Sequence, residues 1–352
     1  MNNTIVVQDT SQIVSALGSE LKQLEGKTIL ISGGAGFLGS YFLNVAEYLN
    51  NSVFRRPCTT ICIDNYITGS RNNLTRPTAS KYIIYIQHDV SKRLNIRRKL
   101  DFIIHAAGIA SPIYYKKFPL EAIDVNTQGT KNLLELGNKN NLKSFLYFSS
   151  SEIYGDPDPR YIPTPESYRG NVSSIGPRAC YDESKRLGEA LSINYFHVYK
   201  VPVKIVRPFN IYGPGMKPTD YRVIPTFVHN ALINKPLPVH DKGKQTRTYC
   251  YISDAITELF KVLLSGVNGE VYNIGNDYPE ITTLDLANKI RKICNNKVRI
   301  KLIPYPNSYP TDVPQRRCPD LSKIKQELKY HPKVSLHLGL LRTMKWYKET
   351  YE

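Results

Sequence analysis

The sequence predicts an α/β protein with a doubly wound parallel sheet and a smaller, interleaved C-terminal domain. Short apolar segments alternate with amphipathic helical segments over the first 208 residues, a pattern typical of βαβ units. A glycine-rich turn joins the first apolar segment to its helix. Prolines and turn residues become frequent after Phe209, where we expect the chain to leave the sheet.

Six strands are expected before Phe209, and a seventh follows in "GEVYNIG" after the helix "YISDAITELFKVLLSG". The six strands lie in "KTILIS", "TTICID", "YIIYIQ", "DFIIH", "LKSFLYF" and "VPVKIVRP". Apolar residues at helical spacing between Ile13 and Leu24 predict an additional helix on the surface of the first domain. The first domain is therefore expected to comprise residues 1–208 and 247–275, and the second 209–246 and 276–352.

Composition narrows the function classes. The chain has 352 residues and a formal net charge of +17, yet its basic residues are spread out. Without a basic run or a nucleic-acid motif, an anionic small molecule is favoured over nucleic acid. No apolar stretch approaches the ~20 residues that span a bilayer, so no membrane association is expected. Six cysteines without a paired spacing predict reduced thiols in the cytoplasm, and no metal site is expected because no ligand cluster occurs.

The segment "GGAGFLG" places Gly33, Gly36 and Gly39 between a strand and a helix. This context is typical of a Rossmann dinucleotide site, in which the helix N-terminus holds the pyrophosphate. The next strand ends at Asp64, which is positioned to bind the ribose hydroxyls and favours NAD over NADP. Arg71 nearby leaves NADP open.

Two further strand ends belong to the same predicted site. Asp89 is expected either to accept a hydrogen bond from the adenine amino group or to cap a helix. The small residues of "HAAG" would let a cofactor lie against the backbone, with His105 as a packed side chain. The residues expected to contact NAD are Gly33, Gly36, Phe37, Leu38, Gly39, Asp64, Asn65, Asp89, Val90, Ala106 and Ala107.

The reacting centre is predicted in "ACYDESKRLGEAL", where Tyr181 and Lys185 stand four residues apart on one helical face. A phenol with a pKa near 10 is a poor base at pH 7, so a neighbouring ammonium group would help it accept a proton. Both residues are also expected to contact NAD. Upstream, "FSSSEIYG" ends a strand with polar side chains, and we expect Ser150, Ser151 and Glu152 to face the same cleft.

The chain resembles the extended short-chain dehydrogenase/reductase superfamily, which modifies nucleotide sugars with bound NAD. The resemblance rests on "GGAGFLGS", "HAAGIASP", "SSSEIYG", "YDESK", "RPFNIYGPG" and "RTYCYISD". Within it, "EIYGDPDP", "IGPRACYDESKR" and "GKQTRTYCYISD" look most like UDP-glucuronate decarboxylases, which make UDP-xylose. The resemblance implies that C4 of the sugar is oxidised, that CO₂ leaves from C5, and that C4 is then reduced.

The same resemblance assigns roles to the serine-rich strand end. Ser150 is expected to hydrogen-bond the C4 oxygen, and Glu152 to contact the ring or to handle protonation at C5. Ser151 stands where the related 4,6-dehydratases carry an aspartic acid, and a hydroxyl cannot replace that acid. This disfavours a dehydratase. A C4 epimerase and a 4-reductase remain alternatives, as does a non-catalytic NAD- or RNA-binding protein.

A nucleotide sugar, with UDP-sugars favoured, needs guanidinium groups for its diphosphate. Arg178 is expected to meet a sugar carboxylate or to form a structural salt bridge. The resemblance also implies a homodimer. The residues expected to bind the substrate are Asn210, Arg222, Arg247, Arg316 and Arg178.

Overall fold

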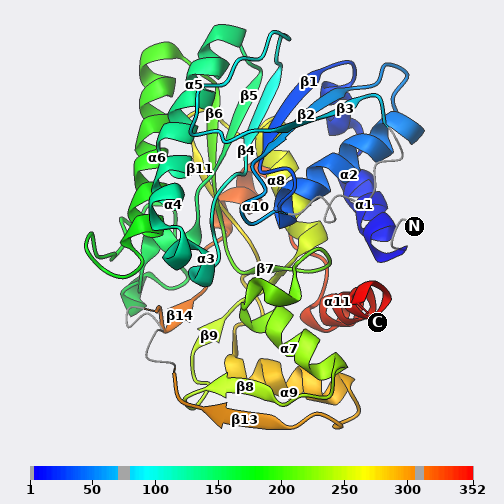
Figure 1. The fold of residues 1–352 in the computed structure, drawn as a ribbon, viewed down its shortest axis with the longest axis vertical. Helices are drawn as coiled ribbons and strands as arrows, with labels where there is room; N and C mark the ends of the chain where they lie inside the picture. Colours follow the sequence, from blue (N-terminus) through cyan, green and yellow to red (C-terminus); the bar gives the residue numbers. More distant parts are fainter. Residues whose placement is uncertain (1–3, 70–79, 306–312, 352) are drawn as a thin grey trace.

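The computed structural model describes residues 4–69, 80–305 and 313–351 and contains a seven-stranded parallel sheet in its upper part (Figure 1). The strand order is β11-β6-β5-β4-β1-β2-β3, in which the chain reverses direction beside β1, as in doubly wound folds. The strands are β1 (Thr28–Ser32), β2 (Thr59–Asp64), β3 (Ile83–Gln87), β4 (Phe102–His105), β5 (Ser144–Phe148), β6 (Val203–Pro208) and β11 (Val271–Ile274).

Helices cover both faces of the sheet, which explains why its strands are apolar on both sides. Neighbouring residues of one strand enter different cores because side chains alternate across a sheet. Leu30 packs in the cluster that contains Leu133, whereas Ile31 packs with Phe42 and Leu259. One face carries α4 (Pro119–Asn126), α5 (Gln128–Asn140) and α6 (Ala179–Tyr199), and the other α2 (Phe37–Ser52) and α8 (Ile252–Ser265).

The expected N-terminal helix is present, and it begins earlier than the spacing indicated. It comprises α1 (Thr4–Leu17) and the 3₁₀ helix η1 (Gly18–Leu24). Ile13, Leu17, Leu21 and Leu24 are buried in the core shared with α2 and α8. The apolar spacing predicted this packing correctly. It did not reveal that Asp9 is also fully buried.

A small lobe, formed by η5 to β9 and by β12 to β14, lies below the large sheet in Figure 1. Its elements are η5 (Pro218–Asp220), α7 (Val223–Leu232), β8 (Leu237–His240), β9 (Thr246–Arg247), β12 (Ile281–Thr282), α9 (Thr283–Ile293), β13 (Ile300–Ile303) and β14 (Arg316–Arg317). β13 pairs with β8, and β9 lies between β12 and β14. Since the strands of the large sheet end towards this lobe, ligands that bind at those ends meet both parts.

The remaining elements complete the two parts. They are α3 (Pro112–Lys117), η3 (Ser151–Tyr154), η4 (Pro159–Tyr161), β7 (Ile211–Tyr212), β10 (Cys250–Tyr251), α10 (Ser322–Leu328) and α11 (Leu336–Tyr351). α10 packs against β11 and α8, so this piece of residues 276–352 lies beside the large sheet. α11 contacts α1, α7 and α9. The division of the chain into two domains at the expected boundaries stays a prediction.

Candidate active site

The glycine turn after β1 leaves room for a ligand at the start of α2. Gly33 has a φ of +76°, and a Cβ there would lie 2.6 Å from the backbone nitrogen of Ala107. A Cβ at Gly39 would overlap the carbonyl oxygen of Gly33. Gly36 precedes Phe37, the first residue of α2. The first backbone N–H groups of a helix lack helical partners, so those of Phe37, Leu38 and Gly39 are available to a pyrophosphate.

A cavity of about 310 Å³ extends from this turn along the carboxyl ends of β2, β3 and β4. Its lining combines small residues, which permit close approach, with carboxylates at two strand ends. Eight of the residues expected to contact NAD line this cavity, and Phe37, Leu38, Gly39, Tyr181 and Lys185 are not part of its lining. The eight are Gly33, Gly36, Asp64, Asn65, Asp89, Val90, Ala106 and Ala107. The residues present therefore fit a dinucleotide.

Asp64 is the acid at the end of β2. Its Oδ2 accepts a hydrogen bond from the Ala35 N–H at 3.0 Å, and its Oδ1 accepts one from the Tyr66 N–H at 2.8 Å. Burial raises the pKa of Asp64, although these hydrogen bonds and the charge of Lys217 oppose the rise. The carboxylate is thus held in place where ribose hydroxyls would meet it. Arg71 lies outside the described residues.

Asp89 forms a local turn. Its Oδ1 accepts hydrogen bonds from the N–H and the hydroxyl of Ser91, at 2.9 and 2.8 Å. The carboxylate still borders the cavity, so a contact with adenine stays a prediction. His105 is fully buried between the hydroxyls of Ser32 and Thr130. Burial lowers the pKa of His105 to about 3, and a packed, neutral ring results.

α6 begins at Ala179 and carries Tyr181 and Lys185 on its buried face. Ser150 lies close enough to Tyr181 to lower the pKa of the phenol, but burial outweighs this effect and raises that pKa overall. The Lys185 ammonium lies 5.9 Å from the centre of the Tyr181 ring and donates to the Phe148 carbonyl at 2.6 Å. Burial lowers the pKa of Lys185 to about 7. The phenol, the hydroxyl and the amine thus meet at the end of β5.

Glu152, in η3, lies between two arginines. The Nη1 and Nη2 atoms of Arg317 donate to Oε1 and Oε2 of Glu152, at 2.5 and 2.7 Å. Arg178 pairs with Glu152 from the other side and with Asp182 at 3.2 Å. The two arginine side chains are 7% exposed. Two nearly buried cations, Arg178 and Arg317, thus face two carboxylates, Glu152 and Asp182, so the charges of this cluster balance.

The other residues near Glu152 differ in their burial and in their hydrogen bonding. Ser150 is the N-cap of η3, and its Oγ accepts a hydrogen bond from the Glu152 N–H at 3.2 Å. Ser151 is buried, with 3% of its surface exposed. The ring of Tyr115, which the sequence did not single out, stacks on Tyr181 with 5.4 Å between centroids. The Tyr115 hydroxyl has no hydrogen-bond partner within the described residues.

The predicted substrate residues lie at several points around the cleft. The charge of Arg222 lowers the pKa of Tyr181, and its Nη2 donates to Asp220 at 2.8 Å. Arg247 pairs in register with Arg317 across β9 and β14, and its Nη2 donates to the Pro314 carbonyl at 2.6 Å. Asn210 donates to the Thr248 carbonyl at 3.0 Å. The contacts of these three residues with substrate stay predictions.

Arg316 and Arg317 differ sharply although they are neighbours. Arg316 is 46% exposed and forms an ion pair with Glu280, with an Nε–Oε1 distance of 2.7 Å. Arg317 instead reaches Glu152. Successive side chains of a strand point to opposite faces, so only one of the pair reaches this pocket. Sequence reasoning selected Arg316 and missed Arg317, because a two-residue strand gives no periodicity from which its inward face can be chosen.

The fold and the site define a dinucleotide-dependent enzyme with a Tyr-x-x-x-Lys centre. Residues 29–275 match the NAD dependent epimerase/dehydratase family. The chain is 41% identical over 313 residues to UDP-glucuronic acid decarboxylase 3 of Arabidopsis thaliana, covering 89% of this chain and 86% of that protein. The chain belongs to the NAD dependent epimerase/dehydratase family, and its cofactor is NAD.

Two solved structures extend the comparison. UDP-glucose 4-epimerase of Thermotoga maritima, solved with UDP-glucose, has a TM-score of 0.80 and 26% identity, covering 92% of this chain and 100% of its own. The dTDP-glucose 4,6-dehydratase of Streptomyces venezuelae, solved with NAD and TYD, has a TM-score of 0.78 and 26% identity, covering 92% and 97%. The predicted fold class, family and cofactor are confirmed.

Two searches of the described residues complete the site. Among residues 4–69, 80–305 and 313–351, no helix is long and apolar enough to cross a membrane. The same residues contain no group of three or more His, Cys, Asp or Glu side chains able to hold a metal ion.

Proposed function

We propose that the protein decarboxylates UDP-glucuronate to UDP-xylose. One observation carries this proposal: Glu152 lies between Arg178 and Arg317, two residues after Ser150 at the end of β5, and Tyr181 of α6 lies beside Ser150. A sugar acid brings a carboxylate, and this carboxylate would share the two guanidinium groups with Glu152. The 41% identity to a UDP-glucuronic acid decarboxylase supports the same reaction.

The chain's own residues supply the proton chemistry at C4 of the sugar. NAD⁺, when bound, accepts a hydride from the sugar and later returns it. Tyr181 takes the proton of the C4 hydroxyl, and Ser150 holds that oxygen through the hydroxyl that lies beside the phenol. Burial disfavours the phenolate, so the positive charge of protonated Lys185 is needed to stabilise it.

The loss of CO₂ follows from the position of the C4 ketone. The carboxylate at C5 is β to that carbonyl, so the electron pair of the breaking bond passes into the carbonyl and forms an enolate. A proton from solvent then adds to C5 in place of the lost CO₂. We assign the orientation of the substrate carboxylate to Arg178 and Arg317, and the relay of this proton to Glu152, which both arginines contact.

A dehydratase is the second candidate. It must protonate a departing hydroxyl, and the predicted position for that acid holds Ser151, whose hydroxyl is buried. A serine hydroxyl is far too weak an acid for this step. Since decarboxylation expels no water, it does not require that acid. This favours the decarboxylase over the dehydratase. An epimerase and a reductase are distinguished from a decarboxylase by the products that each would form.

The deciding experiment incubates the protein with UDP-glucuronate and NAD⁺ and follows the products by mass spectrometry. We expect UDP-xylose and CO₂. Tyr181→Phe should lower the rate by about 1,000-fold or more, because general acid–base catalysis contributes factors of this order. Turnover of another nucleotide sugar without UDP-xylose formation would reject the decarboxylase. Full activity of Tyr181→Phe would reject the assigned base.

We also propose an oligomeric state and a cellular location for the protein. The protein forms a homodimer through α6, whose exposed face carries Leu187 and Val198 at helical spacing. Apolar side chains on an exposed helix face favour burial against a partner. The protein acts in the cytoplasm, since all six cysteines are free thiols. Nucleic acid and membranes are not expected partners.

A further inference from the structure

The bridging segment, residues 213–222, connects β7 to α7 and ties the small lobe to both walls of the cofactor cavity. Lys217 donates from Nζ to the Thr68 carbonyl at 2.9 Å, and Thr68 lines the cavity on the β2 side. On the β4 side, the Ser111 hydroxyl donates to the Asp220 carbonyl at 2.9 Å. Ser111 lies just beyond the lining residues 106–109. One segment therefore holds together two walls that belong to different strand ends.

Lys217 also acts through its charge. The ammonium is close enough to Asp64 to lower the pKa of that carboxyl group, and Asp64 in turn raises the pKa of Lys217 against the effect of burial. Asp64 accepts hydrogen bonds from Ala35, in the glycine turn after β1, and from Tyr66, in the turn that follows β2. Lys217 thus holds residues 64–69 by a hydrogen bond to Thr68 and by attraction to Asp64.

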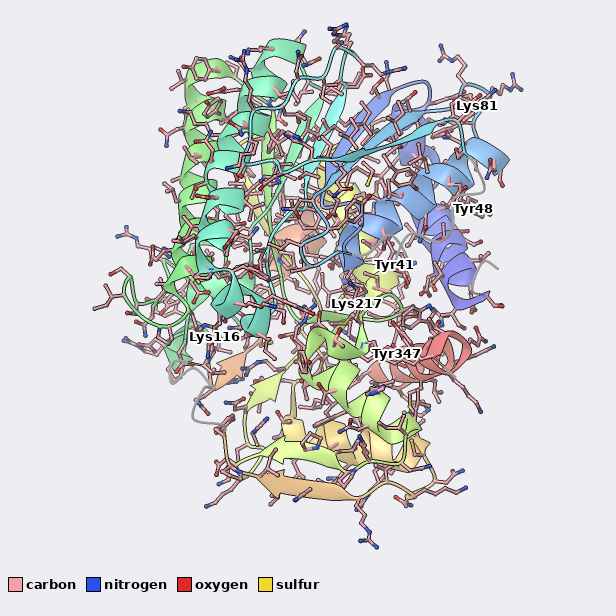
Figure 2. The ribbon with its side chains drawn as sticks, viewed as in Figure 1. Tyr41, Tyr48, Lys81, Lys116, Lys217 and Tyr347 are labelled. Carbon is pink, nitrogen blue, oxygen red and sulfur yellow. The ribbon has the colours of Figure 1, made fainter. Side chains whose placement is uncertain are left out.

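The backbone next to Lys217 is anchored to α11. The hydroxyl of Tyr347, in α11, donates to the carbonyl of Met216 at 2.8 Å, and both side chains are buried. Figure 2 shows Lys217 and Tyr347 where the upper and lower parts of the molecule meet. The backbone beside Lys217 is therefore anchored to a packed helix, so the turn at Thr68 is held by a rigid partner.

We propose that Lys217 retains the cofactor: its bond to Thr68 keeps residues 65–69 closed over the dinucleotide and slows its release. Retention matters because the proposed reaction oxidises and then reduces the same sugar carbon, so the cofactor must stay bound in between. That purpose rests on the proposed function. The tie itself rests on contacts that are present whatever the substrate.

The test measures cofactor release directly. Wild type, Lys217→Met and Lys217→Arg are loaded with NADH, mixed with excess NAD⁺, and followed by the fluorescence of bound NADH. Lys217→Met should release NADH about tenfold faster, the loss expected for one hydrogen bond from a charged donor. Lys217→Arg should recover most of the retention because it keeps the cation. Lys235→Met, an exposed lysine of the same lobe, should release NADH as wild type does.

A second variant protects the test against a simple folding defect. Ser111→Ala removes the hydrogen bond to the opposite wall of the cavity and should also speed the release of NADH. Thermal melting without cofactor should show that Lys217→Met and Ser111→Ala are both folded. Release of NADH at the wild-type rate from Lys217→Met, or equal acceleration by Lys235→Met, would overturn the proposal. Because no sugar is present, faster release without any turnover of UDP-glucuronate would reject the proposed function and leave Lys217 as the retaining residue.

Discussion

At the scale of single residues, some residues of the site could be predicted from the sequence, whereas others are brought together only by the fold. Tyr181, Lys185 and Ser150 could be selected from sequence because a helical spacing and a strand end fix their neighbourhood. Arg317 could not, since its partner Glu152 lies 165 residues away. Such a pair depends on how β14 pairs with β9, and no local pattern encodes that.

The adjacent arginines provide a matched experiment. Arg317→Ala should lower kcat/KM for UDP-glucuronate by about 100-fold, because it removes one of the two buried cations that hold Glu152 and leaves Arg178 alone. Arg316→Ala removes a half-exposed ion pair with Glu280, and kcat/KM should stay within about threefold of wild type. Thermal melting of both variants separates lost catalysis from lost stability. Equal losses of kcat/KM in the two variants would contradict the assignment.

At the scale of elements, sequence periodicity predicted the strands of the large sheet and the N-terminal helix, because each buries an apolar face. The periodicity did not predict the polar contacts that attach α1 to the rest of the protein. Asp9 on α1 accepts hydrogen bonds from Tyr251 in β10 at 2.8 Å, from Tyr41 in α2 at 3.3 Å and from Arg342 in α11 at 3.2 Å. A buried carboxylate interrupts an apolar pattern, so it carries no signal of its partners.

Asp9 makes the attachment of α1 dependent on pH. Burial raises the pKa of Asp9 from 3.8 to about 7, so the folded state binds the proton more tightly than the unfolded state. Stability is therefore greatest below about pH 4 for this group and falls as the pH rises towards 7. Wild type should lose roughly 2–4 °C of melting temperature between pH 5 and 8 through this group.

Asp9→Asn is the control for this pH dependence. The amide cannot titrate, so its melting temperature should change less than that of wild type over the same range. Calorimetric scans of both proteins at matched ionic strength measure the difference. Parallel curves would show that Asp9 is ionised in the folded protein at pH 5, contrary to the effect of its burial.

At the scale of the whole molecule, α6 links the reacting centre to the surface proposed for dimerisation. Its buried face carries Tyr181 and Lys185, and its opposite face exposes Leu187 and Val198 to 50% and 66%. Contact with a second copy along this face would fix the helix that positions the phenol. The order of the strands and the exposed face of α6 depend on long-range packing, which local sequence patterns do not encode. The dimer could therefore be predicted from the sequence only through the family resemblance.

The proposed dimer yields a prediction that connects assembly to catalysis. Wild type should have twice the chain mass of 40.1 kDa in light scattering after gel filtration, and Leu187→Asp should shift it towards the single-chain mass. A carboxylate placed in an apolar interface must lose its water without gaining a partner. Leu338→Asp, at a 41% exposed position of α11, should remain dimeric because that helix lies away from α6. If Leu187→Asp stays dimeric, the interface lies elsewhere. If it becomes monomeric with unchanged kcat, α6 holds the phenol in place without a partner.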